Sequence, residues 1–145
     1  MILDDEYFMR QALTEAKLAF SEDEIPIGAV IVNKNRIIAR AHNLTETLND
    51  VTAHAEMQAI TAAASVMGGK YLTDCTLYVT VEPCPMCAGA LRWAQIAKIV
   101  FGASDEKRGY RTVSPGMLHP HTEVVSGILA DECASLMQLF FEQKR

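Results

Sequence analysis

Four side chains in two short segments of the sequence could together bind a metal ion and move protons. His54 and Glu56 lie two residues apart, and Cys84 and Cys87 lie three residues apart. Residues three apart on a helical turn point to the same side of the helix, so the two sulfurs can face one ion. One imidazole and two thiols make up the soft nitrogen and sulfur set that zinc prefers.

This ligand set indicates a catalytic zinc site, with a structural zinc or a redox cysteine pair as the alternatives. A structural site needs a fourth protein ligand, whereas a catalytic site leaves that position to water. The sequence has no second C-x-x-C and no H-x-x-H to complete a four-ligand site. Glu56 could sit beside the water and transfer its protons. The pattern H-x-E…P-C-x-x-C is a known signature of zinc-dependent base deaminases.

Two helix N-termini are expected to position these four side chains. Thr52 is expected to cap a helix that runs to Met67, where a pair of glycines follows. Pro83 is expected to begin a second helix over residues 84–94, which places both cysteines where the thiolate form is favoured. The apolar stripe of the first of these helices is expected to consist of Met57, Ile60, Ala64 and Met67.

The remaining elements follow from apolar periodicity and turn residues. Residues 103–121 form the least regular part, expected to be a crossover or a substrate-facing loop. The order of elements predicts an α/β fold with a mixed five-stranded sheet flanked by helices. Strands are predicted at residues 29–32, 36–41, 76–81, 98–102 and 123–126, with a tight turn at 33–35. Further helices are predicted at residues 4–22, packed through Met9, Leu13, Ala16 and Phe20, and at 131–143, packed through Leu136, Leu139 and Phe140.

Composition and charge set limits on the class of protein. The 145 residues are expected to form a single domain over 1–145. No apolar run approaches the roughly 18 residues of a membrane-spanning helix, and the acidic start lacks the pattern of a secretion signal. We therefore expect a cytoplasmic protein in which Cys75 and Cys133 are reduced core residues. The net charge of −5 argues against broad electrostatic binding of nucleic acid, but it allows a local basic patch.

Several other residues are candidates for contacts with a substrate. Asn43 ends a predicted strand, where its amide could serve a base or ribose, although an Asn before a loop is usually a turn residue. Pro26 and Gly28 mark a strand start, and Gly28 could also let the backbone approach a flat ligand. Residues 107–111 place three cations around a tyrosine. That stretch suits either a phosphate-and-base contact or a solvated turn.

Longer stretches of the sequence resemble zinc-dependent enzymes of the cytidine-deaminase fold, and among them the tRNA adenosine deaminase group. The resemblance covers essentially the whole chain. Residues 49–56 and 82–87 are also similar to guanine deaminases. The motifs that carry the resemblance are Pro26-Ile27-Gly28-Ala29-Val30, Asn43, Thr52 to Glu56, Leu77 to Ala90, Val100 to Ala103, and Gly127 to Cys133 followed by Phe140-Phe141.

The resemblance implies a three-layer α/β/α fold and conversion of adenosine to inosine at the wobble position of a tRNA anticodon. The alternatives are deamination of a free nucleobase or nucleoside such as guanine or cytosine, and a non-catalytic zinc subunit that binds RNA. A homodimer is implied, with neighbouring subunits forming each substrate channel. The implied zinc ligands are His54, Cys84 and Cys87, with one ion per subunit, and Glu56 is the implied proton shuttle. The implied substrate-binding residues are Asn43, Pro26, Ile27, Gly28, Ala29, Ala55, Pro83 and Asp105.

Three departures from the family pattern fall outside the zinc motifs. Ser104 stands where the family usually has Arg, and the loop after Asp105 is shorter than usual. The basic extension that commonly follows the Phe-Phe pair is reduced to Lys144 and Arg145. All three departures concern contacts with RNA and leave the metal chemistry unchanged.

Overall fold

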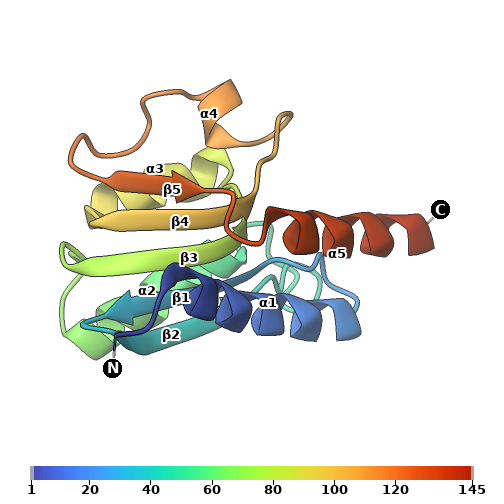
Figure 1. Cartoon of the computed structure of the whole chain (residues 1–145), viewed down its shortest axis with the longest axis horizontal. Helices are drawn as coiled ribbons and strands as arrows, with labels where there is room; N and C mark the ends of the chain where they lie inside the picture. Colours follow the sequence, from blue (N-terminus) through green and yellow to red (C-terminus); the bar gives the residue numbers. More distant parts are fainter. Residues whose placement is uncertain (1, 145) are drawn as a thin grey trace.

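The computed structural model describes residues 2–144 and has one mixed five-stranded sheet between two layers of helices (Figure 1). The strand order is β2-β1-β3-β4-β5, in which β1 pairs antiparallel with β2 and β3, whereas β3, β4 and β5 are parallel. The predicted fold class is therefore confirmed. The strands are β1 (Gly28–Asn33), β2 (Arg36–His42), β3 (Cys75–Val81), β4 (Lys98–Ala103) and β5 (Glu123–Ser126). The helices are α1 (Asp5–Ser21), α2 (Ala55–Met67), α3 (Pro85–Ala94), α4 (Tyr110–Val113) and α5 (Ala130–Gln143).

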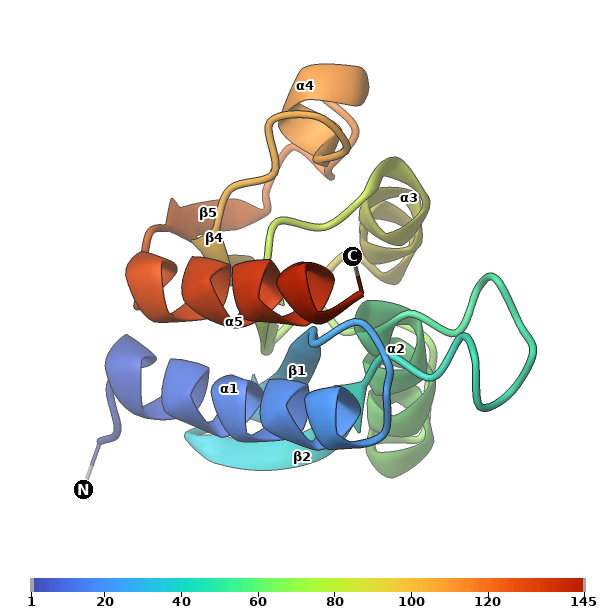
Figure 2. The same cartoon turned by 90° about the vertical axis from the view of Figure 1, so that its right-hand side faces the viewer.

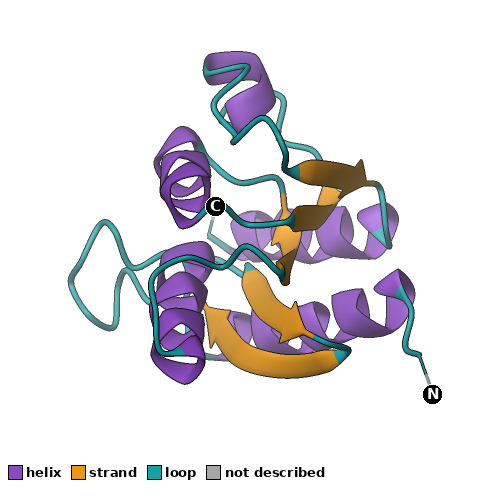
Figure 3. Ribbon diagram, turned by 90° about the vertical axis from the view of Figure 1, so that its left-hand side faces the viewer, coloured by secondary structure: helices purple, strands orange, loops and turns teal. Residues whose placement is uncertain are grey.

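Two helices cover each face of the sheet, and Figures 2 and 3 show the sheet between the two pairs. Side chains alternate between the faces along each strand. Val30, Val32 and Tyr78 pack with residues of α1 and α5. Ile31 and Val79 point the other way and pack with residues of α2 and α3. The molecule thus has two apolar cores, one on each face, and the strands that lead to the site are buried between them.

The turn between β1 and β2 forms as the sequence predicts. Lys34 and Asn35 have φ angles of 50° and 64°, the left-handed conformation that a two-residue hairpin turn requires and that Asn tolerates. The register shifts between Ile31 and Val32, which marks a bulge in the hairpin. The hairpin ends at His42, so it delivers Asn43 to the same end of the sheet as the C-terminal ends of β3 and β4.

Two details predicted for α2 are wrong. The N-cap is His54, because the Thr52 hydroxyl and N–H both donate to Asp50 Oδ1 and stabilise the preceding turn instead. The predicted apolar stripe has the wrong phase, since Met57, Ile60 and Ala64 are only partly buried and Met67 is exposed. Small side chains let the helix lie close to the sheet, and they form the buried face: Ala55, Ala59 and Ala63, together with Glu56.

Three further predictions need adjustment. Helix α3 begins at Pro85 with Cys84 as its N-cap, so Pro83 precedes the helix by two residues. In α5, Phe140 is buried as predicted, but Leu139 is 48% exposed. The segment expected to be irregular contains the short helix α4 and connects β4 to its parallel neighbour β5, which confirms the crossover.

His42 links α1 to the end of β2 through two acidic side chains. Its Nδ1 lies 2.9 Å from Glu15 Oε1, and its Nε2 lies 3.0 Å from Glu22 Oε1. Partial burial lowers the pKa of His42, but the hydrogen bonds and charges of the two glutamates outweigh it, so the net pKa is raised above 6.5. Within residues 2–144, none of the helices combines the length and apolarity needed to cross a membrane.

Candidate active site

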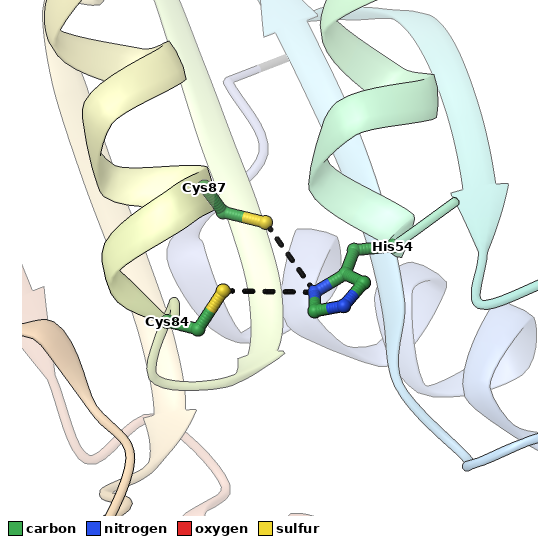
Figure 4. A group of neighbouring side chains, drawn as sticks. All are labelled: His54, Cys84 and Cys87. Carbon is green, nitrogen blue, oxygen red and sulfur yellow. Dashed lines mark hydrogen bonds between the residues drawn. The ribbon is translucent and has the colours of Figure 1, made fainter. Parts of the chain in front are cut away.

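The three predicted metal ligands meet between the N-termini of α2 and α3 (Figure 4). His54 caps α2, Cys84 caps α3, and Cys87 is the third residue of α3. Both sulfurs lie 3.6 Å from Nδ1 of His54. Tetrahedral zinc with bonds of about 2.3 Å to sulfur and about 2.0–2.1 Å to nitrogen separates these atoms by about 3.6 Å. The three residues therefore fit a zinc ion. They are the one such ligand group found among the described residues.

The two thiols have very different proton affinities. A hydrogen bond from Cys87 lowers the pKa of Cys84 to about 4 against the effect of burial, and the neighbouring His54 lowers it further. The hydrogen bond to Cys84 and burial raise the pKa of Cys87 far above its usual range. These contacts favour the thiolate form of Cys84, which is the form that ligates a metal. Its hydrogen bond to His54 raises the pKa of that imidazole against partial burial.

Glu56 lies beside the ligands as the second residue of α2, at the positive end of the helix dipole. Glu56 is only 4% exposed, and it lines the same cavity as His54 and Cys84. Burial raises the pKa of Glu56 from 4.5 to about 7, although the nearby His54 opposes this shift. A carboxyl group with a pKa near neutrality can accept a proton and return it, which is the property a proton shuttle needs.

A cavity of about 440 Å³ opens above these groups, a size typical of sites for small molecules. Glu56, His54 and Cys84 line it, whereas Cys87 is fully buried and is not among the lining residues. The other lining side chains are partly apolar and partly polar, as expected for a pocket that encloses a flat ring and orients it. Of the predicted substrate-binding residues, those that line the cavity are Ile27, Asn43, Ala55 and Asp105.

Pro26, Gly28, Ala29 and Pro83 are not among the residues that line the cavity. Gly28 packs against α1 instead, where a Cβ atom would overlap the carbonyl oxygen of Ala12. The lack of a side chain at Gly28 therefore allows α1 to pack closely against β1. The carbonyl oxygen of Pro83 accepts a hydrogen bond from the N–H of Tyr110 at 2.9 Å, so Pro83 anchors α4.

The three cations of the basic stretch 107–111 lie in two different environments. Lys107 and Arg108 line the cavity, and their N–H groups donate to Oδ1 of Asp105. Arg111 instead has an ion pair with Glu82, with Nη2 3.2 Å from Oε1, and its guanidinium lies over the ring of Phe101. Two cations thus face the cavity, and the third is part of the support beneath it.

Arg111 also contacts the residue at which the sequence departs from the family pattern. Its Nη2 donates to Oγ of Ser104 at 2.8 Å, so a guanidinium does lie beside Ser104 although position 104 itself carries none. Glu82 accepts three hydrogen bonds, from the N–H of Asp105, the N–H of Arg111 and the guanidinium. The segment between Ser104 and Arg111 is held at both ends by these contacts. Arg145 lies outside the described residues, and Lys144 pairs with Asp23 on the surface.

Some residues of the site carry no signal in the sequence. Met137 and Phe141 reach the cavity from α5, the last element of the chain. Neither is predicted from the sequence to contact a substrate, and only the placement of α5 brings them to the site. Glu24 is completely buried although it looks like a surface charge in the sequence, and it accepts a hydrogen bond from Asn43. The other cavity residues absent from the predicted site are Ile25, Thr45, Val81 and Glu82.

Comparison with known families gives a direct match to this arrangement. Residues 3–103 match the model of the cytidine and deoxycytidylate deaminase zinc-binding region, a span that includes all three ligands and Glu56. The chain belongs to this deaminase family. It is 47% identical to the tRNA-specific adenosine deaminase of Bacillus subtilis (strain 168), and the match covers 97% of the chain and 91% of that protein.

Two solved structures extend the comparison to three dimensions. One comes from a study of A-to-I editing by tRNA:A34 deaminases at the wobble position of transfer RNA. It is 43% identical, has a TM-score of 0.83, and covers 90% of this chain and 98% of its own. The other, the guanine deaminase of Bacillus subtilis, is 38% identical with a TM-score of 0.68, and it covers 81% of this chain and 72% of its own.

Proposed function

We propose that this deaminase converts adenosine to inosine at the wobble position of a tRNA anticodon. The observation that carries the proposal is the open set of His54, Cys84 and Cys87 beside a buried Glu56, at a cavity with two cations at its edge. Those cations suit the phosphates on either side of an extruded base. A base in an anticodon loop costs little to extrude, because it is already outside a duplex. The similarity to tRNA-specific adenosine deaminases supports the same substrate.

In this proposal His54, Cys84 and Cys87 hold one zinc ion per subunit, and Glu56 is the catalytic residue. Zinc, when bound, supplies the Lewis acidity that lowers the pKa of water toward neutrality. The Glu56 carboxylate accepts a proton from the attacking water and passes it to N1 of adenine, beside the C6 atom to which the water oxygen adds. The Glu56 carboxylate then takes the remaining proton from the oxygen on C6 and delivers it to the exocyclic amine, which leaves as ammonia while the C6 carbonyl of inosine forms.

The walls of the cavity orient the base during these steps. We assign Asn43, Ile27 and Ala55 to contacts with the nucleoside and Asp105 to the nucleic-acid strand, since all four line the cavity. Pro26, Gly28, Ala29 and Pro83 are assigned a supporting role in this scheme. Enclosure by apolar side chains such as Ile27 and Phe141 excludes bulk water, which strengthens the electrostatic effect of Glu56 on the reacting atoms.

The substrate is tested by comparing ammonia release from an adenosine-containing anticodon stem-loop with release from free guanine, cytosine and adenosine. Release from the stem-loop alone is the expected result. Release only from small molecules would favour a nucleobase deaminase, to which the similarity to a guanine deaminase also points. Release from none would favour a non-catalytic zinc subunit that binds RNA. The matched control is Glu56→Ala, which should keep its zinc and lose turnover, since Glu56 is not a ligand.

We also propose that the protein forms a homodimer through the helices that carry the site. Trp93 on α3 is 81% exposed, an unusual position for a tryptophan on a protein surface. Val66, Met67 and Met86 add exposed apolar side chains on α2 and α3. Sedimentation of wild type and Trp93→Glu tests this surface: a dimer that becomes a monomer is expected, and a wild-type monomer would contradict it.

The other two expectations concern location and domain organisation. We propose that residues 1–145 form one domain, since all five strands belong to one sheet. We propose a cytoplasmic location because tRNA is the substrate assigned above and because four cysteines are free. Fractionation of cells that produce the protein would test the location.

A further inference from the structure

Glu24 is a fully buried carboxylate that the proposed chemistry does not use. It lies in the segment between α1 and β1, and its exposed fraction is 0%. A buried charge is costly unless hydrogen bonds compensate it, so its partners indicate why it is there. Burial raises the pKa of Glu24, but hydrogen bonds from Thr47 and Glu46 and the charge of His42 lower it below 4.5 overall. Glu24 is therefore a carboxylate, with oxygens that can only accept hydrogen bonds.

The partners of this carboxylate all belong to the segment that follows β2. The N–H of Glu46 donates to Oε1 at 3.0 Å, and the N–H and hydroxyl of Thr47 both donate to Oε2 at 2.6 Å. Nδ2 of Asn43 donates to Oε1 at 3.3 Å. Four donors from residues 43–47 thus converge on one side chain. This segment supplies Asn43 and Thr45 to the wall of the cavity.

The contacts of Asn43 determine which end of its amide faces the cavity. An acceptor-only partner requires the amide nitrogen, so Glu24 fixes Nδ2 on its own side. The second proton of Nδ2 goes to Oγ1 of Thr45 at 3.2 Å. Both protons of Nδ2 are then used, whereas none of the hydrogen bonds described for residues 2–144 has Asn43 Oδ1 as its acceptor. The free end of the amide is an acceptor on the cavity wall.

We propose that Glu24 is a positioning residue that locks Asn43 so that it presents a hydrogen-bond acceptor to the substrate. The inference rests on the proposed function, in which Asn43 contacts the nucleoside. Without Glu24 the amide can rotate by half a turn and present a donor instead, because nothing else distinguishes its two ends as strictly. The substrate group that meets Asn43 must accordingly be a donor. Glu24 itself touches neither the metal ligands nor the cavity, so its effect on catalysis passes through Asn43.

The first measurement is steady-state kinetics of zinc-loaded variants on the adenosine-containing stem-loop. Glu24→Gln should raise KM about tenfold, the size of one lost charge-assisted hydrogen bond, with a smaller change in kcat and unchanged zinc content. Asn43→Ala should raise KM similarly, and adding Glu24→Gln to it should change KM less than about twofold, since both act at one contact. The proposal would be overturned if the effects of the two single substitutions on KM multiplied in the double variant. It would also be overturned if Glu24→Gln had the KM of the wild type.

Two further variants separate positioning from general structural support. Asn43→Asp places two carboxylates together, and adding Glu24→Gln should partly restore its KM, because the introduced amide can donate to the introduced carboxylate and leave an acceptor on the wall. A purely structural role gives no such rescue. Thr47→Val is the matched control: it removes one hydrogen bond to Glu24 without touching Asn43, so the melting temperature should fall and KM should stay unchanged. If Glu24→Gln does not fold, Thr45→Val frees the same amide and should raise KM several-fold.

A readout independent of activity keeps this inference separate from the proposed function. In ¹⁵N spectra of the wild-type protein, the Asn43 side-chain NH₂, identified by its loss in Asn43→Ala, should be protected from exchange with water. Glu24→Gln should remove that protection, and Thr47→Val should retain it. Fast exchange in the wild type would overturn the proposal. A wild-type protein inactive on all substrates would overturn the proposed function, while the exchange measurement still decides the role of Glu24.

Discussion

Replacing Arg111 by alanine should destabilise the protein, because Arg111 compensates the buried carboxylate of Glu82. The Glu82 side chain is 2% exposed and the guanidinium lies 3.2 Å away. Removing one partner of a fully buried pair costs about 3–5 kcal/mol. Arg111 is 45% exposed, so solvent screens part of the interaction. The N–H groups that also donate to Glu82 remain. We therefore expect a loss of about 1–2 kcal/mol, or roughly 3–8 °C in melting temperature.

The assay is thermal unfolding of zinc-loaded protein followed by circular dichroism, with Arg108→Ala as the matched control. Arg108 lies three residues away in the same segment and has no ion pair among the described residues. Its loss should leave the melting temperature within about 1 °C of the wild type and weaken binding of the stem-loop. An unchanged melting temperature in Arg111→Ala would refute the assigned support of Glu82. An equal fall in both variants would refute it too.

Three other expectations follow from contacts described above. Gly28→Ala should lower the free energy of unfolding in urea by about 3 kcal/mol, because the added Cβ atom would meet the carbonyl oxygen of Ala12. The control Gly69→Ala should be near neutral, because a Cβ atom there would point into open space. His42 stabilises the fold as an imidazolium, because its pKa is raised in the folded state. The difference in the free energy of unfolding between wild type and His42→Asn should therefore be largest below pH 6.5 and should shrink as the pH rises through the raised pKa. Equal differences well below and well above that pKa would contradict this. Cys87→Ala should lose zinc after dialysis, and a stoichiometric metal content by mass spectrometry would count against its role as a ligand.

Local patterns in the sequence predict the strands and the turn of this fold well. Apolar runs and turn residues locate all five strands to within about a residue. The three central strands, β1, β3 and β4, are buried on both faces and are therefore apolar almost throughout. Strand order depends instead on contacts between distant segments, which a local pattern does not contain. The phase of α2 escapes prediction for a similar reason. The apolar part of its buried face consists of alanines. Their small side chains allow α2 to pack closer to the sheet than Met57 and Ile60 would.

The residues of the site also differ in whether local sequence patterns or only tertiary contacts reveal them. His54, Cys84 and Cys87 could be found because zinc restricts both the type of its ligands and their spacing. Glu24 and Glu82 could not be found, because no pattern in the sequence shows that folding encloses these two charged side chains. Their burial is a property of the tertiary structure, and so are the hydrogen bonds that make them supports for the two sides of the cavity.

The parallel pairing of β4 and β5 places part of the cavity wall on a segment separate from the proposed metal ligands. A parallel pair needs a long connection, here residues 104–122, and that connection begins at the edge of the cavity. It carries Asp105, Lys107 and Arg108, whereas the metal ligands lie on α2 and α3. We therefore expect substitutions in the connection to change what the cavity recognises while the sheet and the metal site are preserved. Such a modular design accounts for one scaffold serving relatives that act on a transfer RNA and relatives that act on guanine.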